Sequence, residues 1–334
     1  MIRVGIIGSG GMGNVHARQY SKRSDVDVAF YDHNPGRAEG FRKSWGFEFL
    51  SGIDELIKRS DVVDVCLPTP AHHEIGLKVI AQGKALFMEK PVARTVKQAH
   101  ELYQAAEKAN VPFMPGQVVR FFPEYVQAQK AVASGKIGKP AAARASRGGG
   151  APSGEGGWFM DHTKSGGVLL DLSIHDFDWL RWTLGEVKSL YSRTLGAATD
   201  MGPDHGLTTL TFDNGCVAHV EGTWMDPGGF RTTFELAGSG GLIQHDSRQN
   251  VPLQTTSTKT ASEKSEGAPL PSYDGNLIEL EDPYFLELDA FLTAVRTGSK
   301  PPVTGLDGLH AVSIAEAAIE SSKTGKVVSP ARAF

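Results

Sequence analysis

Ile2-Arg3-Val4-Gly5-Ile6-Ile7-Gly8-Ser9-Gly10-Gly11-Met12-Gly13 is the stretch that decides the fold. Its first half is a continuous apolar run, the pattern of a parallel strand covered on both faces. Its second half fits the spacing G-x-G-x-x-G and leads into a predicted helix at 14–20. Gly8 allows a tight turn, Gly10 lets the backbone approach a pyrophosphate, and Gly13 permits close packing of helix on strand. The stretch predicts a dinucleotide-binding unit, although an ordinary glycine-rich turn would show the same spacing.

An acidic residue follows the next predicted strand, at 26–31. Asp32 lies 19 residues after Gly13, where a carboxylate can accept hydrogen bonds from both ribose hydroxyls of an adenosine and would repel a 2′-phosphate. This favours NAD over NADP. NADP stays open as an alternative because Arg37 could bind a phosphate, and Asp32 could instead serve only as a turn former before His33.

Strands and helices alternate through the first third of the chain, which predicts a doubly wound parallel sheet. The predicted helices are 37–45, 53–58, 74–82 and 95–109, and the further strands are 47–50, 62–67, 84–88 and 111–114. Two strands end in loops that would meet at the carboxyl edge, where open α/β sheets bind ligands. One loop is Pro68-Thr69-Pro70-Ala71-His72-His73, with its backbone and histidine facing the cofactor groove, and the other is Glu89-Lys90-Pro91. Lys90 is the first catalytic candidate, although a surface lysine at a loop start would look the same.

The pattern changes from residue 140 onward. Alternating segments at 141–147, 186–196, 207–212, 216–224 and 232–237 predict a largely antiparallel open sheet, and Asp213-Asn214-Gly215 is a hairpin signal. The polar segment 245–275 predicts a mobile loop, a hairpin arm or a disordered insertion, and 289–296 and 308–322 read as amphipathic helices. We therefore expect an NAD(P)-binding Rossmann domain at 1–118 and an α+β domain for substrate binding and oligomerisation at 119–334.

A second group of polar residues lies at 166–181. Asp171, His175 and Asp178 are spaced four and three apart, so on one helix they share a face. A histidine beside carboxylates is a candidate general base, because an aspartate fixes its tautomer and supports the imidazolium that forms. The alternative is that Asp171 caps a helix and His175 is a core residue. Close-spaced His/Cys ligands are missing here, so we expect no metal.

Composition limits the other functions. The 334 residues carry a net charge of -4, without the basic surplus of a nucleic-acid binder, and only two cysteines, which argues against structural disulfides. Apolar runs fall short of the roughly 20 residues of a membrane helix, and the amino-terminal run is too short for a signal peptide. These features predict a cytoplasmic globular protein that binds neither nucleic acid nor membrane.

Together the motifs resemble the Gfo/Idh/MocA oxidoreductases, named for glucose-fructose oxidoreductase and inositol dehydrogenase. The resemblance rests on Gly8-x-Gly10-x-x-Gly13, the loop Pro68 to His72, Gly83-Lys84, and Glu89-Lys90-Pro91, with 17 residues from His72 to Glu89. It departs from the family pattern in Thr69-Pro70 and in Ala85-Leu86. The family's D-x-x-x-H pattern matches Asp171 and His175, and the sequence around them looks particularly like inositol dehydrogenases and related sugar dehydrogenases.

The resemblance implies an NAD(P)-dependent dehydrogenase that reversibly oxidises a secondary hydroxyl of a polyol or sugar, inositol-like or pyranose. His175 would take the proton, Asp171 would orient His175, and Lys90 would hold the oxygen. Expected cofactor-binding residues are Gly8, Gly10, Gly11, Met12, Gly13, Asp32, His33, Arg37, Pro68, Thr69, His72, Glu89 and Lys90. Expected substrate-binding residues are Lys90, Arg120, Trp158, His162, Asp171 and His175, with Lys164 as a further candidate. A homodimer or homotetramer through the C-terminal sheet is also implied. An NAD-dependent redox glycosidase and a non-catalytic dinucleotide and sugar sensor remain as alternatives.

Overall fold

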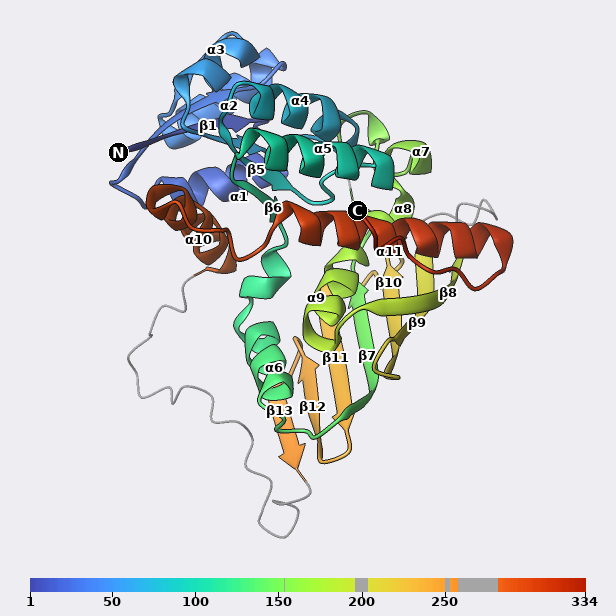
Figure 1. Cartoon of the computed structure of the whole chain (residues 1–334). Coiled ribbons are helices and arrows are strands. Elements are labelled where there is room, and N and C mark those ends of the chain that lie inside the picture. Colours follow the sequence, from blue (N-terminus) through green and yellow to red (C-terminus); the bar gives the residue numbers. More distant parts are fainter. Residues whose placement is uncertain (153, 196–203, 250–252, 258–281) are drawn as a thin grey trace. The chain divides into compact units, whose positions relative to one another are not determined.

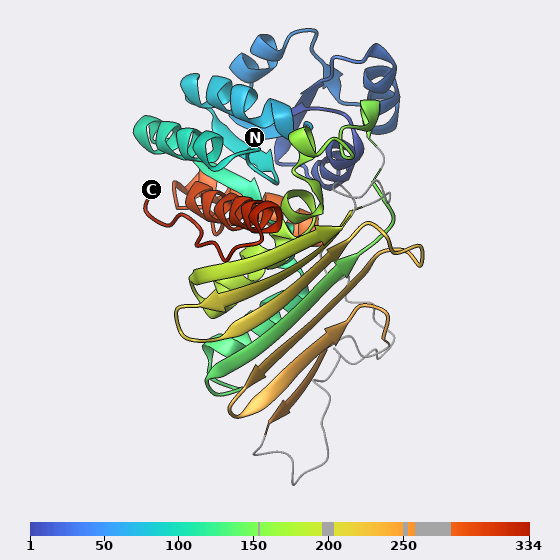
Figure 2. The same ribbon diagram turned by 90° about the vertical axis from the view of Figure 1, so that its right-hand side faces the viewer.

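A computed structural model describes residues 1–152, 154–195, 204–249, 253–257 and 282–334 (Figures 1 and 2). The chain forms two compact units. The first unit combines Met1–Val118 with Glu281–Val312, and the second combines Val119–Leu280 with Ser313–Phe334. This division differs from the predicted one because the segment 281–312 groups with the amino-terminal part. The assignment of the two domains to cofactor and substrate stays a prediction.

The first unit contains a sheet of six parallel strands in the order β3-β2-β1-β4-β5-β6. The strands are β1 Ile2–Ile7, β2 Val26–Tyr31, β3 Glu48–Phe49, β4 Val62–Val65, β5 Ala85–Glu89 and β6 Phe113–Gly116. The sheet order reverses direction between β1 and β4, the kind of switch point at which doubly wound folds bind ligands. β4 and β5 are buried along their whole length, which explains their unbroken apolar runs. The predicted doubly wound sheet is confirmed.

The helices of this unit connect its strands or follow later in the chain. They are α1 Gly11–Tyr20, α2 Pro35–Trp45, α3 Ile53–Arg59, α4 Thr69–Ala81, α5 Val96–Ala109 and α10 Pro283–Thr297, and the long helix α11 Gly305–Thr324 begins in this unit. α4 begins five residues before the predicted helix at 74–82. Pro70 is compatible with this start, because the N–H groups in the first turn of a helix have no partner within the helix and proline lacks only that N–H. The predicted loop after β4 is therefore mostly the first turn of a helix.

α10 packs on α1, although some 260 residues separate them in the chain. The Arg23 guanidinium, just after α1, lies 2.6 Å from an Asp289 carboxylate oxygen, and Gln19 donates to Asp282 at 2.9 Å. Asp282 also caps α10 by accepting the Tyr284 N–H. These contacts explain why the segment after 281 belongs to the amino-terminal unit.

The second unit is built on a sheet in the order β13-β12-β11-β7-β10-β9-β8, which Figure 2 shows obliquely. The strands are β7 Pro140–Gly148, β8 Val187–Leu195, β9 His205–Phe212, β10 Val217–Thr223, β11 Arg231–Gly238, β12 Gly241–Asp246 and β13 Leu253–Ser257. Neighbours are antiparallel except β7 and β10, which are parallel. The helices are α6 Pro123–Ala133, α7 His162–Ser165, α8 Gly167–Asp171 and α9 Ile174–Leu184, with short 3-10 helices η1 Val118–Phe121 and η2 Glu155–Gly157.

This sheet buries one face. Along β9, β10 and β11 every second residue is buried. Phe234 on β11 packs against Tyr125 on α6 and Trp179 on α9, and the three rings have centroids 4.7–4.9 Å apart. The predicted hairpin joins β9 to β10, with Gly215 at φ 87°. The predicted mostly antiparallel open sheet is confirmed. β12 was not predicted, and most of the polar segment 245–275 lies outside the described residues. In the part of the chain that the structure describes, no helix is long and apolar enough to cross a membrane.

Candidate active site

The glycine turn after β1 leaves an open cradle at the amino terminus of α1. Gly8 has φ 101°, and a Cβ on Gly13 would lie 2.0 Å from the Gly8 carbonyl oxygen, so α1 can approach the turn only without a side chain there. In contrast, apart from the adjoining residues and the backbone of α1, no described atom lies within 4 Å of a Cβ built on Gly10 or Gly11. Met12, the next residue, is half-buried. Open space above backbone N–H groups at a helix start fits a pyrophosphate.

Asp32 is fixed at the end of β2. Its carboxylate accepts the Ser9 N–H at 2.8 Å, the Ser9 hydroxyl at 2.7 Å and the Asn34 N–H at 2.7 Å. Arg37 donates to it at 3.0 Å, while His33 is exposed and 3.7 Å away. Burial alone would raise the pKa of Asp32, but these hydrogen bonds hold it below its ordinary value. The structure therefore keeps a carboxylate anion beside the glycine turn and neutralises it in part with Arg37.

His72 lies in the first turn of α4 rather than in a loop facing the groove. Its ring is buried, and its two nitrogens lie 2.7 Å from the carbonyl oxygens of Leu67 and Pro91. Burial lowers the pKa of His72 below its ordinary value. Both nitrogens face backbone carbonyl oxygens, of which the neutral ring donates to one, so His72 lies between the ends of β4 and β5 rather than facing the cofactor groove. Pro68 caps α4 and Thr69 is buried at its start.

β5 delivers Glu89 and Lys90 to the carboxyl edge, as predicted from the run before the Glu-Lys-Pro motif. Glu89 is buried, and one of its carboxylate oxygens accepts the Lys90 N–H at 3.0 Å. Lys90 is half-buried. The peptide that follows, Lys90-Pro91, is cis. The Lys90 side chain thus starts from the same sheet edge as the glycine turn, two strands away in the sheet.

In the second unit, Asp171 and His175 do not lie on one helix. α8 ends at Asp171 and α9 begins at Ile174, because the N–H groups of Leu172 and Ser173 both donate to the Val168 carbonyl at 3.0 and 2.9 Å and interrupt the regular helical pattern. Asp171 is buried and His175 is half-buried. The single-helix prediction was wrong, and the two residues instead flank a break between two helices.

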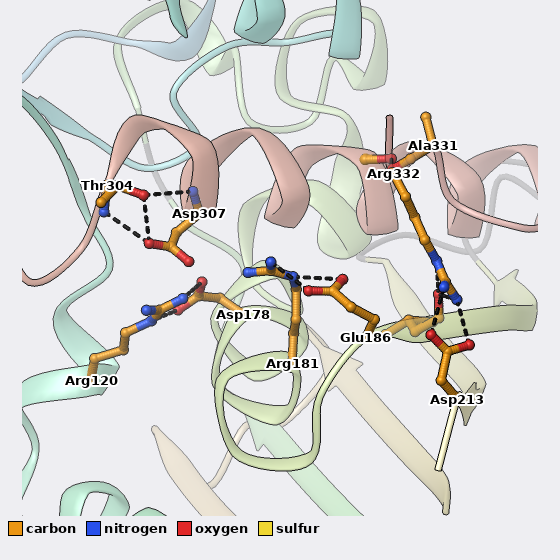
Figure 3. A network of polar contacts seen from close by, with 11 residues as sticks. Arg120, Asp178, Arg181, Glu186, Asp213, Thr304, Asp307, Ala331 and Arg332 are labelled. Atoms are coloured by element: carbon orange, nitrogen blue, oxygen red, sulfur yellow. Dashed lines mark hydrogen bonds and ion pairs between the residues drawn. The ribbon is translucent and has the colours of Figure 1, made fainter. Parts of the chain in front are cut away.

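Asp178, three residues after His175 on α9, binds Arg120, as Figure 3 shows. Two guanidinium nitrogens of Arg120 donate to its two carboxylate oxygens at 2.7 and 2.6 Å, and both side chains are buried. The Arg120 guanidinium also lies 5.4 Å from the centre of the Trp182 ring. Arg120 was predicted to bind substrate. The structure places its charge in a buried ion pair that holds η1 on α9.

The remaining substrate candidates lie near the glycine pair at 166–167. His162 lies 3.5 Å from Asp204, whose carboxylate also accepts the Val168 N–H at 2.9 Å. Burial raises the pKa of Asp204 above its ordinary value. Trp158 stacks on Phe159, and the exposed Lys164 pairs with Asp161. Asp204 was missed from the sequence, where an acidic residue just before a strand is too common a pattern to single out.

Family profiles match most of the chain. Residues 2–117 match the profile described as "Oxidoreductase family, NAD-binding Rossmann fold", and residues 125–244 match the GFO/IDH/MocA C-terminal domain. The scyllo-inositol 2-dehydrogenase (NAD(+)) of Bacillus subtilis is 30% identical over 98% of this chain and 96% of its own. The chain belongs to the Gfo/Idh/MocA oxidoreductase family. The predicted family and the predicted use of NAD are thereby confirmed.

Other Gfo/Idh/MocA proteins are similar over the whole length. Inositol 2-dehydrogenase of Rhizobium meliloti is 28% identical over 96% of both chains. The solved structure of a levoglucosan dehydrogenase in complex with NADH and levoglucosan superposes with a TM-score of 0.87, at 23% identity over 99% of both chains. At that identity the structural likeness establishes the fold alone. This Gfo/Idh/MocA chain is an oxidoreductase with an NAD-binding Rossmann domain.

Proposed function

We propose that this oxidoreductase oxidises a secondary hydroxyl of a polyol or cyclic sugar to a ketone, reversibly, with NAD. The observation that carries the proposal is the position of Lys90 at the carboxyl edge of the sheet. β5 ends at the edge where the Gly8–Gly13 turn and Asp32 also lie, so a cation stands beside a cradle suited to a dinucleotide. Relatives named inositol 2-dehydrogenase and scyllo-inositol 2-dehydrogenase support the substrate class.

Each residue has a distinct role in this proposal. When bound in the cradle, NAD would supply the acceptor for the hydride that leaves the carbinol carbon. His175 takes the hydroxyl proton, Asp171 fixes the tautomer of His175, and the Lys90 ammonium stabilises the negative charge that develops on the oxygen. Gly10, Gly11 and α1 hold the pyrophosphate, and Asp32 holds the adenosine ribose.

Five further residues stay proposed as neighbours of the cofactor: Met12, His33, Arg37, Pro68 and Thr69. For substrate, Trp158 and His162 stay proposed, and Asp204 joins them because it contacts His162. Arg120 would act only indirectly, through its ion pair with Asp178.

The first test is NADH formation by the purified protein across a panel of inositols, aldoses and anhydrosugars. A strong signal on one ring supports the dehydrogenase and gives the stereochemistry. Cleavage of a glycoside without net NADH would replace this proposal by a redox glycosidase. Retained NAD with neither activity would favour a sensor.

The roles are tested by Lys90→Ala and His175→Ala. A positioned proton carrier contributes about 10²-fold or more, so each variant should lose at least about that much turnover while keeping its affinity for NAD. Lys97→Ala is a matched control, because Lys97 is an exposed lysine on α5. Undiminished turnover in both site variants would remove Lys90 and His175 from the mechanism.

We also propose that two or four copies assemble through the open face of the second sheet. Tyr191, Leu195 and Leu207 are exposed apolar side chains on β8 and β9. Such residues on an uncovered sheet face are typical of a contact with a second copy. Light scattering of Leu207→Glu against the parent protein tests this. An unchanged mass would exclude Leu207 from the interface, and a parent protein that is monomeric would reject the assembly.

A further inference from the structure

A buried histidine on α1 lies behind the glycine turn. His16 is fully buried, and its Nδ1 lies 2.8 Å from an Asp64 carboxylate oxygen on β4. The Tyr20 hydroxyl donates to the same oxygen at 3.1 Å, and the Cys66 thiol lies 3.3 Å from His16 Nδ1. Burial alone would lower the pKa of His16, but the Asp64 carboxylate raises it well above its ordinary value. The Asp64 contact thus favours the protonated, cationic form of the His16 ring in the core of the first unit.

The other nitrogen of this cation faces the motif that carries Lys90. His16 Nε2 lies 3.2 Å from Oε1 of Glu89, an ion-pair distance without the alignment of a hydrogen bond. Oε2 of the same carboxylate accepts the Lys90 N–H at 3.0 Å. Gly116 on β6 leaves the room for this side chain, since a Cβ there would lie 3.3 Å from the Glu89 Cα, Cδ and Oε1 atoms. The Glu89 carboxylate is thus held between a buried cation and the backbone of Lys90.

A second buried histidine holds the other neighbour of Lys90. His72 Nδ1 lies 2.7 Å from the Pro91 carbonyl oxygen, and Nε2 lies the same distance from that of Leu67. Since α4 carries His72, the ring ties the chain after Lys90 to the end of β4. The residues on both sides of Lys90 are therefore anchored, Glu89 by His16 and Pro91 by His72.

We propose that His16 and His72 are positioning residues for Lys90, His16 through the Glu89 carboxylate and His72 through the Pro91 carbonyl. This rests on the proposed catalytic role of Lys90. A lysine must be held to within a fraction of an ångström to stabilise charge on a reacting oxygen, and two fixed neighbours restrict its backbone without touching the substrate. Neither histidine contacts reacting atoms in this proposal.

The buried cluster around His16 also has to be considered as a metal site. The side chains of His16, Asp64 and Cys66 lie close enough to hold a metal ion, with ligand atoms within 4.8 Å of one another. The hydrogen bonds among them account for this closeness without a metal. Metal analysis of the purified protein decides the point. A stoichiometric transition metal lost in a Cys66→Ser variant would make His16 a ligand and overturn the proposal.

The main test measures hydrogen exchange at the Lys90 amide in the full-length protein without substrate. His16→Gln and Glu89→Gln keep the approximate side-chain size but remove the ion pair between residues 16 and 89. His72→Phe keeps a ring but removes the nitrogen that faces the Pro91 carbonyl. Each should speed exchange at Lys90 by about tenfold or more and lower kcat by a similar factor, and in His16→Gln the Kd for NAD should stay within about twofold. His72→Asn, which keeps an N–H donor, should restore part of the His72→Phe loss.

A double-mutant cycle separates positioning from general destabilisation. If His16 acts through Glu89, His16→Gln with Glu89→Gln should lose no more turnover than the worse single variant. Cys66→Ala is the matched control, since it changes the same cluster without touching Glu89, and it should leave exchange at Lys90 unchanged. Lower stability with unchanged exchange at Lys90, or additive losses in the cycle, would overturn the proposal.

The outcome is separable from that of the proposed function. If Lys90→Ala keeps full turnover, the catalytic role of Lys90 fails, whatever the exchange shows. Faster Lys90 exchange in His16→Gln and His72→Phe would still show that the two histidines hold this backbone.

Discussion

Replacing Gly13 by alanine tests the glycine turn most directly. The new Cβ would lie 2.0 Å from the Gly8 carbonyl oxygen, whereas carbon and oxygen atoms in contact are normally about 3.3 Å or more apart. α1 and the turn must therefore separate by about 1.3 Å. Overpacking of a close contact typically costs about 1–3 kcal/mol. The atoms that move form the pyrophosphate cradle, so the affinity for NAD should fall by about tenfold or more, the equivalent of about 1.4 kcal/mol.

Two neighbouring glycines supply the controls. Apart from the adjoining residues and the backbone of α1, a methyl group on Gly10 or Gly11 meets no described atom within 4 Å. Gly10→Ala should therefore change the stability of the cofactor-free protein by less than about 1 kcal/mol, yet weaken NAD binding because the methyl group enters the cradle. Gly11→Ala, at the first position of α1, should be as stable as the parent or slightly more so, because alanine favours helix over glycine by about 1 kcal/mol.

The assay combines urea unfolding without cofactor and calorimetric titration with NAD. The order of stability expected is Gly11→Ala, Gly10→Ala, then Gly13→Ala as the least stable. A Gly13→Ala protein that unfolds like the parent, or equal losses of stability for Gly10→Ala and Gly13→Ala, would refute the assignment of separate packing and binding roles to these glycines.

Three further predictions follow from charged groups. Asp32→Ser should shift the kcat/KM ratio from NAD toward NADP by about tenfold, since the carboxylate that repels a 2′-phosphate is gone; an unchanged ratio would contradict its role. Arg120→Met should lower the free energy of unfolding by about 3–5 kcal/mol by removing the buried ion pair from the Asp178 carboxylate, and adding Asp178→Leu should recover most of it. The pKa of His16 is raised on folding, so its stabilisation is complete below about pH 6.5 and declines above it, by up to about 1.4 kcal/mol per pH unit. The difference in unfolding free energy between the parent and His16→Gln should shrink as pH rises, and a constant difference would contradict a buried cation.

The sequence predicts the amino-terminal sheet well because local signals agree there. Apolar runs, the glycine spacing and the loops after 62–67 and 84–88 each depend on neighbours within a few residues, and all point to one edge. The antiparallel sheet was predicted for the same reason, down to the hairpin at Asn214-Gly215. The parallel pairing of β7 with β10 was not, since it joins segments 75 residues apart.

The candidate site was predicted less completely, because its partners are distant in the chain. Helical spacing placed Asp178 near His175, but nothing local showed that Arg120, 58 residues away, binds its carboxylate. His72 was placed facing the groove, since nothing local shows that Pro91 binds its ring. His16 and Asp64 looked like ordinary helix and strand residues until the fold brought them together.

The contact of α10 with α1 has a consequence for synthesis on the ribosome. The amino-terminal unit is discontinuous, and Asp289, which ion-pairs with Arg23 across the contact of α10 with α1, emerges only after more than 260 further residues have been translated. An N-terminal nascent chain can form its strands and helices early, but the face of α1 that α10 covers stays bare until translation is almost finished. Contacts of such long sequence separation slow folding and leave surface exposed to aggregation. A fragment ending at residue 118 would lack α10 permanently, and a circular permutation that places 282–297 ahead of Met1 would turn this late step into an early one.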